Sequence, residues 1–297
     1  MNERTILAPG IDLRLTLSAL RHGPRDPTFR VEGAAVWRAV RTPGGPGTVR
    51  YERAGDDVKV AAWGPGADWL LDAAPDAIGL NDNPDDFRPP DTLMRTFHRS
   101  RAGLRMCRSN RIVQTLVPTI LEQRVTTVES HSAYRYLVHV LGEPAPGPTR
   151  MKLPPDPKVL AALPYHAFHR FGIERGRATT IRAVCSYAKR LEETVTMSRE
   201  IARKRLRALP GVGAWTIAEI ERVVFGDPDA VRPNDYHLPH VVSWVLAGER
   251  RADDERMMEL LEPYRGHRAR AALLMELCAD HAPRRAPRAR LRNIERH

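Results

Sequence analysis

The sequence predicts a mainly α-helical chain that carries a small α+β domain at its N-terminus. Two observations support this fold class. Beyond about Pro90, apolar residues recur at helical spacing in one segment after another, whereas the first ninety residues hold short stretches rich in Val, Ala and Trp between glycine turns. A chain of 297 residues is long enough for about two domains. We therefore expect an α+β sheet domain over residues 1–95, a two-lobed helical domain over 96–282, and a basic tail over 283–297 for which disorder is expected.

The N-terminal domain is predicted to contain a small antiparallel sheet. Phe29–Val40, Thr48–Glu52 and Val58–Trp63 are rich in β-forming residues, and glycine turns separate them at residues 44–47 and 55–57. Asp68–Ala74 is predicted to be helical. A short sheet with a helix beside it is an α+β arrangement.

The helical part is predicted from apolar periodicity and from residues typical of helix ends. Ile112, Leu116, Ile120 and Leu121 share one helical face, and a second helix over Val125–Leu141 is followed by glycine. Residues 142–158 hold six prolines, so they can form neither regular helix nor a central strand, and we expect a stiff surface connection. Further helices are expected over residues 174–191, 199–208, 214–225, 238–246, 253–261 and 267–280.

The charge balance favours a polyanionic partner. Lys and Arg number 47 against 36 Asp and Glu, which gives a net charge of +11. Nucleic acid is the first partner to consider, although heavy arginine usage can also reflect genome composition. The tail over 283–297 carries six arginines; such a tail is typically solvated, and it could also add phosphate affinity.

Several classes of protein are disfavoured. The three cysteines include no C-x-x-C pair, which argues against a zinc knuckle or an iron–sulfur cluster. No apolar stretch approaches the length of a bilayer span, and the first residues lack the apolar segment of a signal peptide, so we expect a cytoplasmic protein. His166 with His169, and His237 with His240, are spaced three apart, but no further ligands complete a site, and no catalytic metal is expected.

One motif between two predicted helices carries most of the functional information. Residues 209–216 read Leu-Pro-Gly-Val-Gly-Ala-Trp-Thr. The proline and glycines end the first helix and permit a tight turn, and the second helix then begins with free N–H groups. Such a helix start can bind a phosphate, because a DNA backbone can approach the amides of Gly211, Gly213 and Ala214, and the Thr216 hydroxyl could add a hydrogen bond. The alternative is an ordinary glycine-rich connection between packed helices.

A carboxylate follows 22 residues beyond Gly213. Asp235 precedes a helix whose first turn contains Pro239, so Asn234 or Asp235 is expected to be the N-cap. Capping alone would explain the residue. A carboxylate at a helix start is also held ionised, and a fixed anion is what cleavage of a nucleotide's glycosidic bond requires, since the sugar acquires oxocarbenium character.

These motifs resemble those of a known family. The pairing of Leu-Pro-Gly-Val-Gly-Ala-Trp-Thr with a downstream Asp-Tyr resembles the helix-hairpin-helix superfamily of base-excision DNA glycosylases, and within it the bacterial inducible 3-methyladenine branch. Residues 119–126 (Thr-Ile-Leu-Glu-Gln-Arg-Val-Thr) and 262–269 (Glu-Pro-Tyr-Arg-Gly-His-Arg-Ala) resemble two further family segments. The resemblance covers about residues 105–280, and the N-terminal segment resembles that branch's sheet domain in pattern only.

The resemblance implies roles for particular residues. Asp235 would be the catalytic aspartate, which stabilises the cationic sugar or orients water. Trp215 and Tyr236 would face the flipped base, although Trp215 could instead be a core residue. Aromatic faces attract N-alkylated purines because these bases are cationic, and their charge makes them good leaving groups. Members that also act as lyases have a lysine where Trp215 stands, so the resemblance implies a monofunctional enzyme that leaves an abasic site.

The resemblance also implies contacts around the hairpin. Gly211, Gly213, Ala214 and Thr216, together with Gln123 and Arg124, would contact duplex DNA. Structural Na⁺ or K⁺ would be held by backbone carbonyls of the hairpin, those of Arg207, Leu209 and Val212.

Three positions depart from the family pattern. Arg124 stands where the branch has an apolar residue that fills the gap left by the flipped base; an arginine there could stack on bases or contact phosphate. Glu219 replaces an aromatic, and could hydrogen-bond a base edge or pair with Arg222. The last pocket aromatic falls near Leu273. The pocket is therefore less aromatic than in the branch.

The function expected from these observations is excision of alkylated purines from duplex DNA by a monomeric glycosylase in base excision repair, by base flipping and Asp235-assisted hydrolysis. A glycosylase for deaminated or oxidised bases is the alternative within enzymes. A non-catalytic helix-hairpin-helix DNA-binding protein is the alternative outside them, with Asp235 kept as a helix cap.

Overall fold

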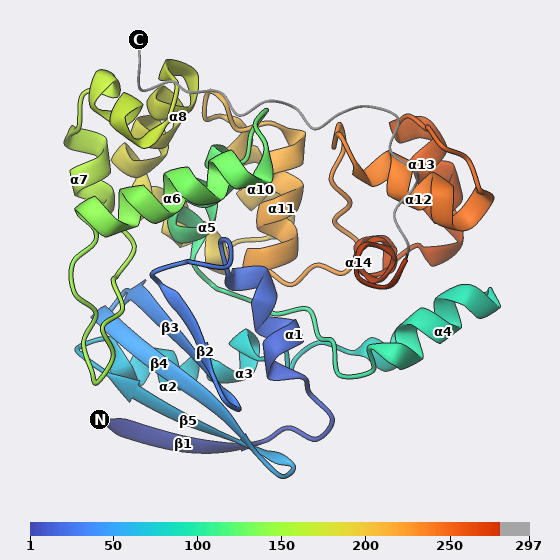
Figure 1. Ribbon diagram of the computed structural model, residues 1–297, viewed down its shortest axis with the longest axis horizontal. Coiled ribbons are helices and arrows are strands. Elements are labelled where there is room, and N and C mark those ends of the chain that lie inside the picture. The colour runs from blue at the N-terminus through green and yellow to red at the C-terminus, as the bar shows by residue number, and fades with distance from the viewer. Residues whose placement is uncertain (280–297) are drawn as a thin grey trace.

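The computed structural model describes residues 1–279, and the predicted tail over 283–297 lies outside the described residues. A five-stranded antiparallel sheet forms the N-terminal part, and helices form the rest, which confirms the predicted fold class (Figure 1). Short 3₁₀ turns lie at Ser18–Leu20, Pro84–Asp86, Tyr165–Phe171, Glu193–Thr196 and Glu262–Tyr264. No helix within residues 1–279 is both long enough and apolar enough to cross a bilayer.

The sheet has the strand order β1-β5-β4-β3-β2, and its strands are β1 (Asn2–Leu7), β2 (Phe29–Glu32), β3 (Ala35–Thr42), β4 (Gly45–Ala54) and β5 (Asp57–Trp63). The segment Phe29–Val40, predicted as one strand region, is a hairpin instead, because Gly33 adopts a positive φ of 53° between β2 and β3. Strand β1 was not predicted. It is an exposed edge strand, so its sequence lacks an apolar face.

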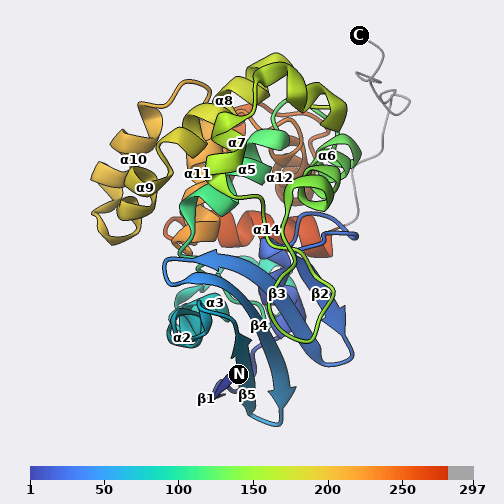
Figure 2. The same ribbon diagram turned by 90° about the vertical axis from the view of Figure 1, so that its left-hand side faces the viewer.

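Both faces of the sheet are covered. One face packs Val36, Val49 and Val60 against helices α1 (Leu13–Leu17), α2 (Ala67–Asp72) and α3 (Ala74–Ala77). The opposite face presents Trp37 and Trp63 to residues 142–158, which we call the proline-rich strap. The strap contributes the buried side chains Ala145, Met151 and Leu153, and it lies over the sheet in Figure 2.

The first helical lobe surrounds one long apolar core. Its helices are α5 (Ile112–Leu121), α6 (Thr127–Leu141), α7 (Pro157–Ala162), α8 (Arg175–Ser186), α9 (Ala188–Glu192), α10 (Arg199–Arg207) and α11 (Ala214–Val224). Helix α5 is central, since nine of its ten residues are buried. The helix expected over residues 174–191 is broken at Tyr187, whose φ of −100° and ψ of 14° depart from helical values and end α8.

The second helical lobe combines α4 (Thr92–Ser100) with α12 (Leu238–Ala247), α13 (Asp254–Leu261) and α14 (Arg268–Cys278) (Figure 1). Met94, Val242, Met257 and Leu274 share its core. Helix α4 spans the predicted boundary between residues 95 and 96 and packs against α14. The chain thus visits this lobe twice, before and after building the first lobe.

Candidate active site

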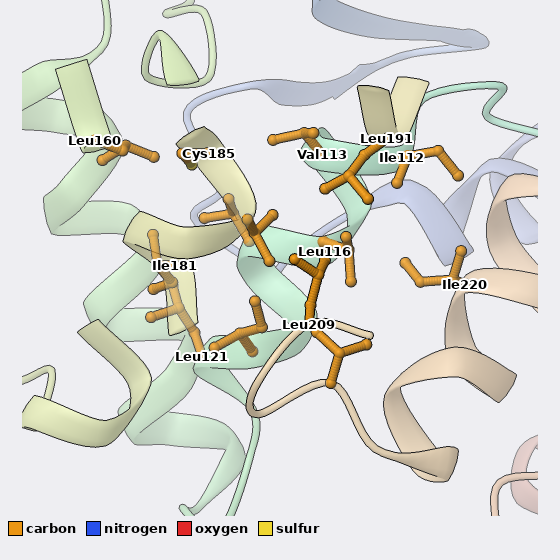
Figure 3. Close-up of a cluster of buried hydrophobic side chains, with 14 of the residues drawn as sticks. Ile112, Val113, Leu116, Leu121, Leu160, Ile181, Cys185, Leu191, Leu209 and Ile220 are labelled. Carbon is orange, nitrogen blue, oxygen red and sulfur yellow. The ribbon is translucent and has the colours of Figure 1, made fainter. Parts of the chain in front are cut away.

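The turn between α10 and α11, residues 208–213, is anchored to the first lobe by two apolar side chains. Leu209 and Val212 are buried, and Figure 3 shows Leu209 directed into the cluster formed by α5, α8 and their neighbours. The Val212 amide donates to the Leu209 carbonyl at 3.1 Å and closes the turn. Gly211 adopts a φ of +82°, and a Cβ there would lie 2.1 Å from Thr180 Oγ1. This hairpin turn is therefore a rigid element that requires glycine at position 211.

The outer side of the hairpin turn presents backbone groups to solvent. Gly211, Gly213 and Ala214 are exposed, and a Cβ at Gly213 would meet nothing within 4 Å. Within the part of the chain that the structure describes, no acceptor lies within hydrogen-bond distance of the amides of Gly213, Ala214 and Trp215. Free amides at a helix start attract anions, so the geometry suits a phosphate.

Thr216 lies behind the hairpin turn rather than on its exposed outer side, and Gln123 is bonded to it. Thr216 is only 2% exposed. The Gln123 side-chain amide donates to Thr216 Oγ1 at 2.9 Å and to the Gly211 carbonyl at 3.0 Å. The phosphate contact expected of the Thr216 hydroxyl does not fit this burial. Gln123 supports the turn from the end of α5.

Asp235 lies in the loop of residues 226–237 between α11 and α12, which we call the Asp235 loop. Its Oδ1 accepts the amides of His237 at 2.9 Å and Leu238 at 3.0 Å. Its Oδ2 accepts the Trp215 indole N–H at 2.8 Å, and Arg232 Nε lies 3.6 Å away. The residue at the N-cap position is His237, not Asn234 or Asp235 as predicted, but the Asp235 carboxylate supplies the capping hydrogen bonds.

The electrostatic surroundings keep Asp235 ionised. The side chain is 15% exposed. Burial alone would raise the pKa of its carboxyl, but the Arg232 charge and the hydrogen bonds from Trp215, His237 and Leu238 outweigh burial and lower that pKa below its ordinary value. Asp235 is therefore a fixed anion that water only partly covers.

Trp215 connects the hairpin turn to this carboxylate. It occupies the first turn of α11, directly after the turn glycines, and its indole N–H is bonded to Asp235. Two roles are expected of Trp215 from the sequence, a base-facing ring and a core residue. The indole N–H of the half-buried ring hydrogen-bonds the carboxylate, a contact that neither alternative included.

A chain of ion pairs extends from Asp235 into the protein. Glu219 forms a two-pronged pair with Arg222, which is one of the two alternatives drawn from the sequence. Arg232 Nη2 bonds Glu276 of α14 at 2.7 Å, and its Nη1 lies 3.9 Å from Glu219. Burial raises the pKa of Glu219, but Arg222 and Arg232 together lower it below its ordinary value. Arg232 and Glu276 were not recognised from the sequence.

A second carboxyl, that of Glu122, has a raised pKa and interacts with the charges of this network. Glu122 follows the last residue of α5. Burial, reinforced by the Glu219 and Asp235 charges and opposed by Arg232 and Arg222, raises the pKa of Glu122 to about 7. Glu122 can therefore hold or release a proton near neutral pH. In the sequence it stands beside Gln123, and only its burial distinguishes it from an ordinary surface glutamate.

Tyr236 lies at the mouth of the site. Its side chain is 81% exposed, and its ring meets His237 and His240 edge-on. Tyr236 and Asp235 line the same open depression, together with Asp254. The ring is thus open to solvent and is not enclosed in a pocket.

Two further predicted positions, Arg124 and Leu273, form no hydrogen bond or ion pair with Asp235 in the described residues. Arg124 is exposed in the turn between α5 and α6, where it adopts a φ of 55°, which is uncommon for a residue with a side chain. Leu273 lines a cavity of about 130 Å³ with Arg222, Cys107 and Leu277, and Asp235 is not among the residues that line it.

The side chains of the described residues offer few sets of metal ligands. Among residues 1–279, no group of three or more His, Cys, Asp or Glu side chains is arranged to hold a metal ion. The hairpin turn offers backbone carbonyls instead. The Leu209 carbonyl accepts the Val212 amide and retains a second lone pair, so it fits the proposed monovalent cation.

Solved structures match this chain in fold, whereas no protein-family model matches it and no curated protein matches its sequence. A 3-methyladenine DNA glycosylase from Archaeoglobus fulgidus matches with a TM-score of 0.78 at 17% identity, over 93% of this chain and 97% of that one. An 8-oxoguanine glycosylase/lyase from Clostridium acetobutylicum matches with a TM-score of 0.70 at 11% identity, over 94% and 97%. A 3-methyladenine DNA glycosylase from Schizosaccharomyces pombe, in complex with abasic DNA, matches with a TM-score of 0.53 at 14% identity, over 65% and 96%. At these identities the likeness establishes the fold, for the sheet as well as the helices.

Proposed function

We propose that this chain, which has the helix-hairpin-helix DNA glycosylase fold, is itself a DNA glycosylase that hydrolyses the N-glycosidic bond of damaged nucleotides in base excision repair. The observation that carries the proposal is the Asp235 carboxylate, ionised and bonded through Trp215 to the helix start that follows the hairpin turn. This bond places a fixed anion beside an element suited to a DNA backbone. A helix cap alone would not need Trp215 or Arg232.

The lowered pKa of Asp235 favours charge stabilisation over proton abstraction. As the bond from C1′ to the base breaks, its electron pair leaves with the base and the sugar becomes cationic. The anion stabilises this cation, and water then adds to C1′ and loses a proton. A carboxylate has about four lone-pair positions. Three amide or indole hydrogens occupy three of them, which leaves one on Oδ2 for water or the sugar.

The proposal includes hydrolysis without lyase chemistry. A lyase needs an amine that attacks C1′ to form a Schiff base. Trp215 occupies the position at which the resemblance places that lysine, and the sequence has no lysine after Lys204. The expected product is an abasic site in an unbroken strand.

The substrate that we propose is an alkylated purine of the 3-methyladenine type. Such a base is cationic, so it leaves as a neutral molecule without a proton donor. The exposed Tyr236 ring could stack on it, and cation–π attraction would favour the charged base.

A deaminated or oxidised base is the second candidate substrate, and one observation favours it. A neutral base departs more readily when it is protonated, and Glu122 can carry a proton near neutral pH. Glu219, which stands where the family branch has an aromatic, is part of an ion network.

Duplex DNA would bind across the hairpin turn, with the amides of Gly213 and Ala214 on a phosphate and Arg124 stacked on bases or bonded to a neighbouring phosphate. Na⁺ or K⁺ on the carbonyls of Arg207, Leu209 and Val212 would strengthen the positive field of the turn. A monomer would suffice, since the proposed site is built from one chain.

The experiment that tests the proposal measures base release from duplexes that each carry one lesion: 3-methyladenine, 7-methylguanine, hypoxanthine, 8-oxoguanine or uracil. Wild type is compared with Asp235→Asn and with Asp12→Asn, a matched change at the capping aspartate of α1. We expect Asp235→Asn to lower the single-turnover rate constant at least about 100-fold while DNA affinity stays the same. Asp12→Asn should leave both unchanged.

Two results would overturn the proposal. If Asp235→Asn released bases as fast as wild type, Asp235 would be only a cap. If wild type bound duplex DNA but released none of the five bases, a DNA-binding protein would be the better assignment. Strand cleavage without alkali, or a borohydride-trapped complex, would contradict the absence of lyase activity.

A further inference from the structure

Arg232 is the one arginine in the described part of the chain that the structure places against three carboxylates around the site. Its Nη2 bonds Glu276 at 2.7 Å, its Nη1 lies 3.9 Å from Glu219, and its Nε lies 3.6 Å from Asp235 Oδ2. Its side chain is 19% exposed. The edge formed by Nε and Nη2 therefore faces Asp235 and Glu276, Nη1 faces Glu219, and the planar group cannot turn without losing one of these contacts.

The anchoring contact lies next to the Nε–H that faces Asp235, because Nε and Nη2 share one edge of the guanidinium. Glu276 belongs to α14, whereas Asp235 lies on the loop before α12. Because Nη2 is bonded to Glu276, the Nε–H edge is held toward Asp235. At 3.6 Å this edge is too distant for a good hydrogen bond and close enough for a strong charge interaction. Arg232 thus approaches Oδ2 without occupying its remaining lone pair.

The charge balance of the cluster depends on the same residue. Glu219, Asp235 and Glu276 supply three negative charges, and Arg222 and Arg232 supply two positive ones. Without Arg232, the Glu219 pair with Arg222 would persist, but Asp235 and Glu276 would face each other uncompensated. Protonation of Asp235 would then relieve the repulsion.

We propose that Arg232 is the positioning residue of Asp235, which fixes both the orientation and the negative charge of the carboxylate for the reaction. This inference rests on the proposed function for its consequence in turnover, but the coupling between the two side chains can be measured without turnover. The alternative is that Arg232 only ties the Asp235 loop to α14. A structural tie would affect thermal stability but not the titration of Asp235.

Several other charged or titratable groups face Asp235 or Arg232 and enter the interpretation of any pH profile. Glu219 and Arg222 project from α11, Glu122 lies at the end of α5, and Glu276 lies on α14. The groups on the open side are Tyr236, His237, His240, Asp253, Asp254 and Glu255. The experiment therefore follows the Asp235 carboxyl itself as well as the rate.

The test compares wild type with Arg232→Gln, Arg232→Lys and Arg256→Gln. Arg256 also bridges two glutamates on the second lobe, and it is neither paired with Asp235 nor among the residues that line the depression beside it, so its variant is the matched control. The Asp235 carboxyl is titrated by ¹³C NMR, and single-turnover base release is measured from pH 5 to pH 9. Thermal unfolding and affinity for a duplex with an abasic analogue report on folding and binding.

We expect Arg232→Gln to move the Asp235 titration and the acidic limb of the rate profile to higher pH together, with at least a tenfold fall in rate at pH 5.5. Arg232→Lys keeps the charge but loses the fork, so the acidic limb should stay near its wild-type pH while the rate constant falls several-fold at every pH. Arg256→Gln should match wild type.

Unchanged Asp235 titration in Arg232→Gln overturns the proposal. If Arg232→Lys has the wild-type rate, the proposal that Arg232 orients the carboxylate is overturned. If the acidic limb of its rate profile moves to another pH, the proposal that Arg232 keeps the carboxylate charged is overturned. If Arg232→Gln does not fold, the Lys variant decides both questions. If wild type releases no base, the proposed function fails, whereas the NMR titration still supports or overturns the coupling.

Discussion

The hairpin turn and the Asp235 loop are joined by one hydrogen bond, from Trp215 to Asp235, yet different forces hold them. The hairpin turn is fixed by buried Leu209 and Val212 and by the neutral side-chain amide of Gln123. The Asp235 loop is fixed mainly by charges. Asp229 bonds the Arg268 guanidinium and the amides of Gly266 and Arg268, Arg232 bonds Glu276, and the Asn234 amide donates to Asp254.

Because of this difference, we expect the Asp235 loop to be sensitive to pH and salt and the hairpin turn, which is the proposed binding surface, to be insensitive. Apolar burial and neutral hydrogen bonds change little with pH or salt, whereas ion pairs respond to both. The pKa values of Asp229 and Asp235 are lowered in the folded protein. Their stabilising contribution is therefore present above the unfolded-state pKa and is lost as pH falls through the folded-state pKa. Acid should loosen the loop that carries the chemistry before it loosens the hairpin turn.

The largest effect is expected at Gly211. Alanine there would need a positive φ and would place a Cβ 2.1 Å from Thr180 Oγ1. We expect a loss of about 3 kcal/mol in the free energy of unfolding, measured by urea denaturation. Gly213→Ala is the matched control, since its Cβ meets nothing, and it should cost less than about 1 kcal/mol while weakening DNA affinity. Equal losses for the two variants would contradict a turn fixed by packing.

Glu122→Gln should have the next largest effect, and one that depends on pH. The folded-state pKa of Glu122, about 7, lies above the ordinary glutamate value of 4.5, so the stability associated with its protonated form is lost as pH rises through about 7. Glutamine should therefore stabilise the protein by about 2 kcal/mol at pH 8 and change little at pH 4. Urea denaturation at both values checks this. A gain that does not vary with pH would mean that Glu122 is not titrating.

Trp215→Phe breaks the hydrogen bond between the hairpin turn and the Asp235 loop while keeping an aromatic ring. It removes the indole N–H that bonds Asp235. A hydrogen bond to a charged group contributes about 1.5 kcal/mol or more, so we expect at least a tenfold fall in the single-turnover rate constant with unchanged DNA affinity. Trp69→Phe, in the sheet domain, is the control. A wild-type rate in Trp215→Phe would show that the bond to Asp235 does not contribute to the reaction.

The smallest effect tests the comparison itself. Gln123→Ala removes two neutral hydrogen bonds from the hairpin turn. It should lower the free energy of unfolding by about 1 kcal/mol at two salt concentrations that differ tenfold, 50 mM and 500 mM. Arg268→Gln removes the Asp229 ion pair, and its cost should shrink in the higher salt because ions screen the pair. If both costs changed equally with salt, the two regions would not differ in the way proposed.

Local signals in the sequence account for the parts of the molecule that could be predicted. Helix α11 begins at Ala214, as predicted, because the glycines before it end α10 and open a turn. Pro239 likewise places the start of α12. Strand β1 could not be predicted, since an exposed edge strand needs no apolar alternation. The helix break at Tyr187 also lacked a proline or glycine to mark it.

The sequence points to some residues of the candidate site but not to the contacts among them. Asp235, Trp215 and Glu219 were identified, but the bond between Trp215 and Asp235 joins residues 20 apart, and that between Arg232 and Glu276 joins residues 44 apart. No spacing rule predicts such contacts, because they depend on how the two lobes pack. The burial that perturbs Glu122 is likewise a property of the fold.

The proline-rich strap has a consequence for how the molecule assembles. Its Lys152 donates from the backbone to Pro27 before β2 and from Nζ to the carbonyls of His139 and Gly142 at the end of α6. These partners lie far apart in sequence, so the strap can dock only after sheet and helix are both in place. We expect a late-folding segment that makes sheet and helices unfold in one cooperative transition. Lys152→Ala removes the Nζ bonds to α6 but keeps the backbone bond to Pro27, so it should weaken this link and lower the midpoint of the calorimetric transition.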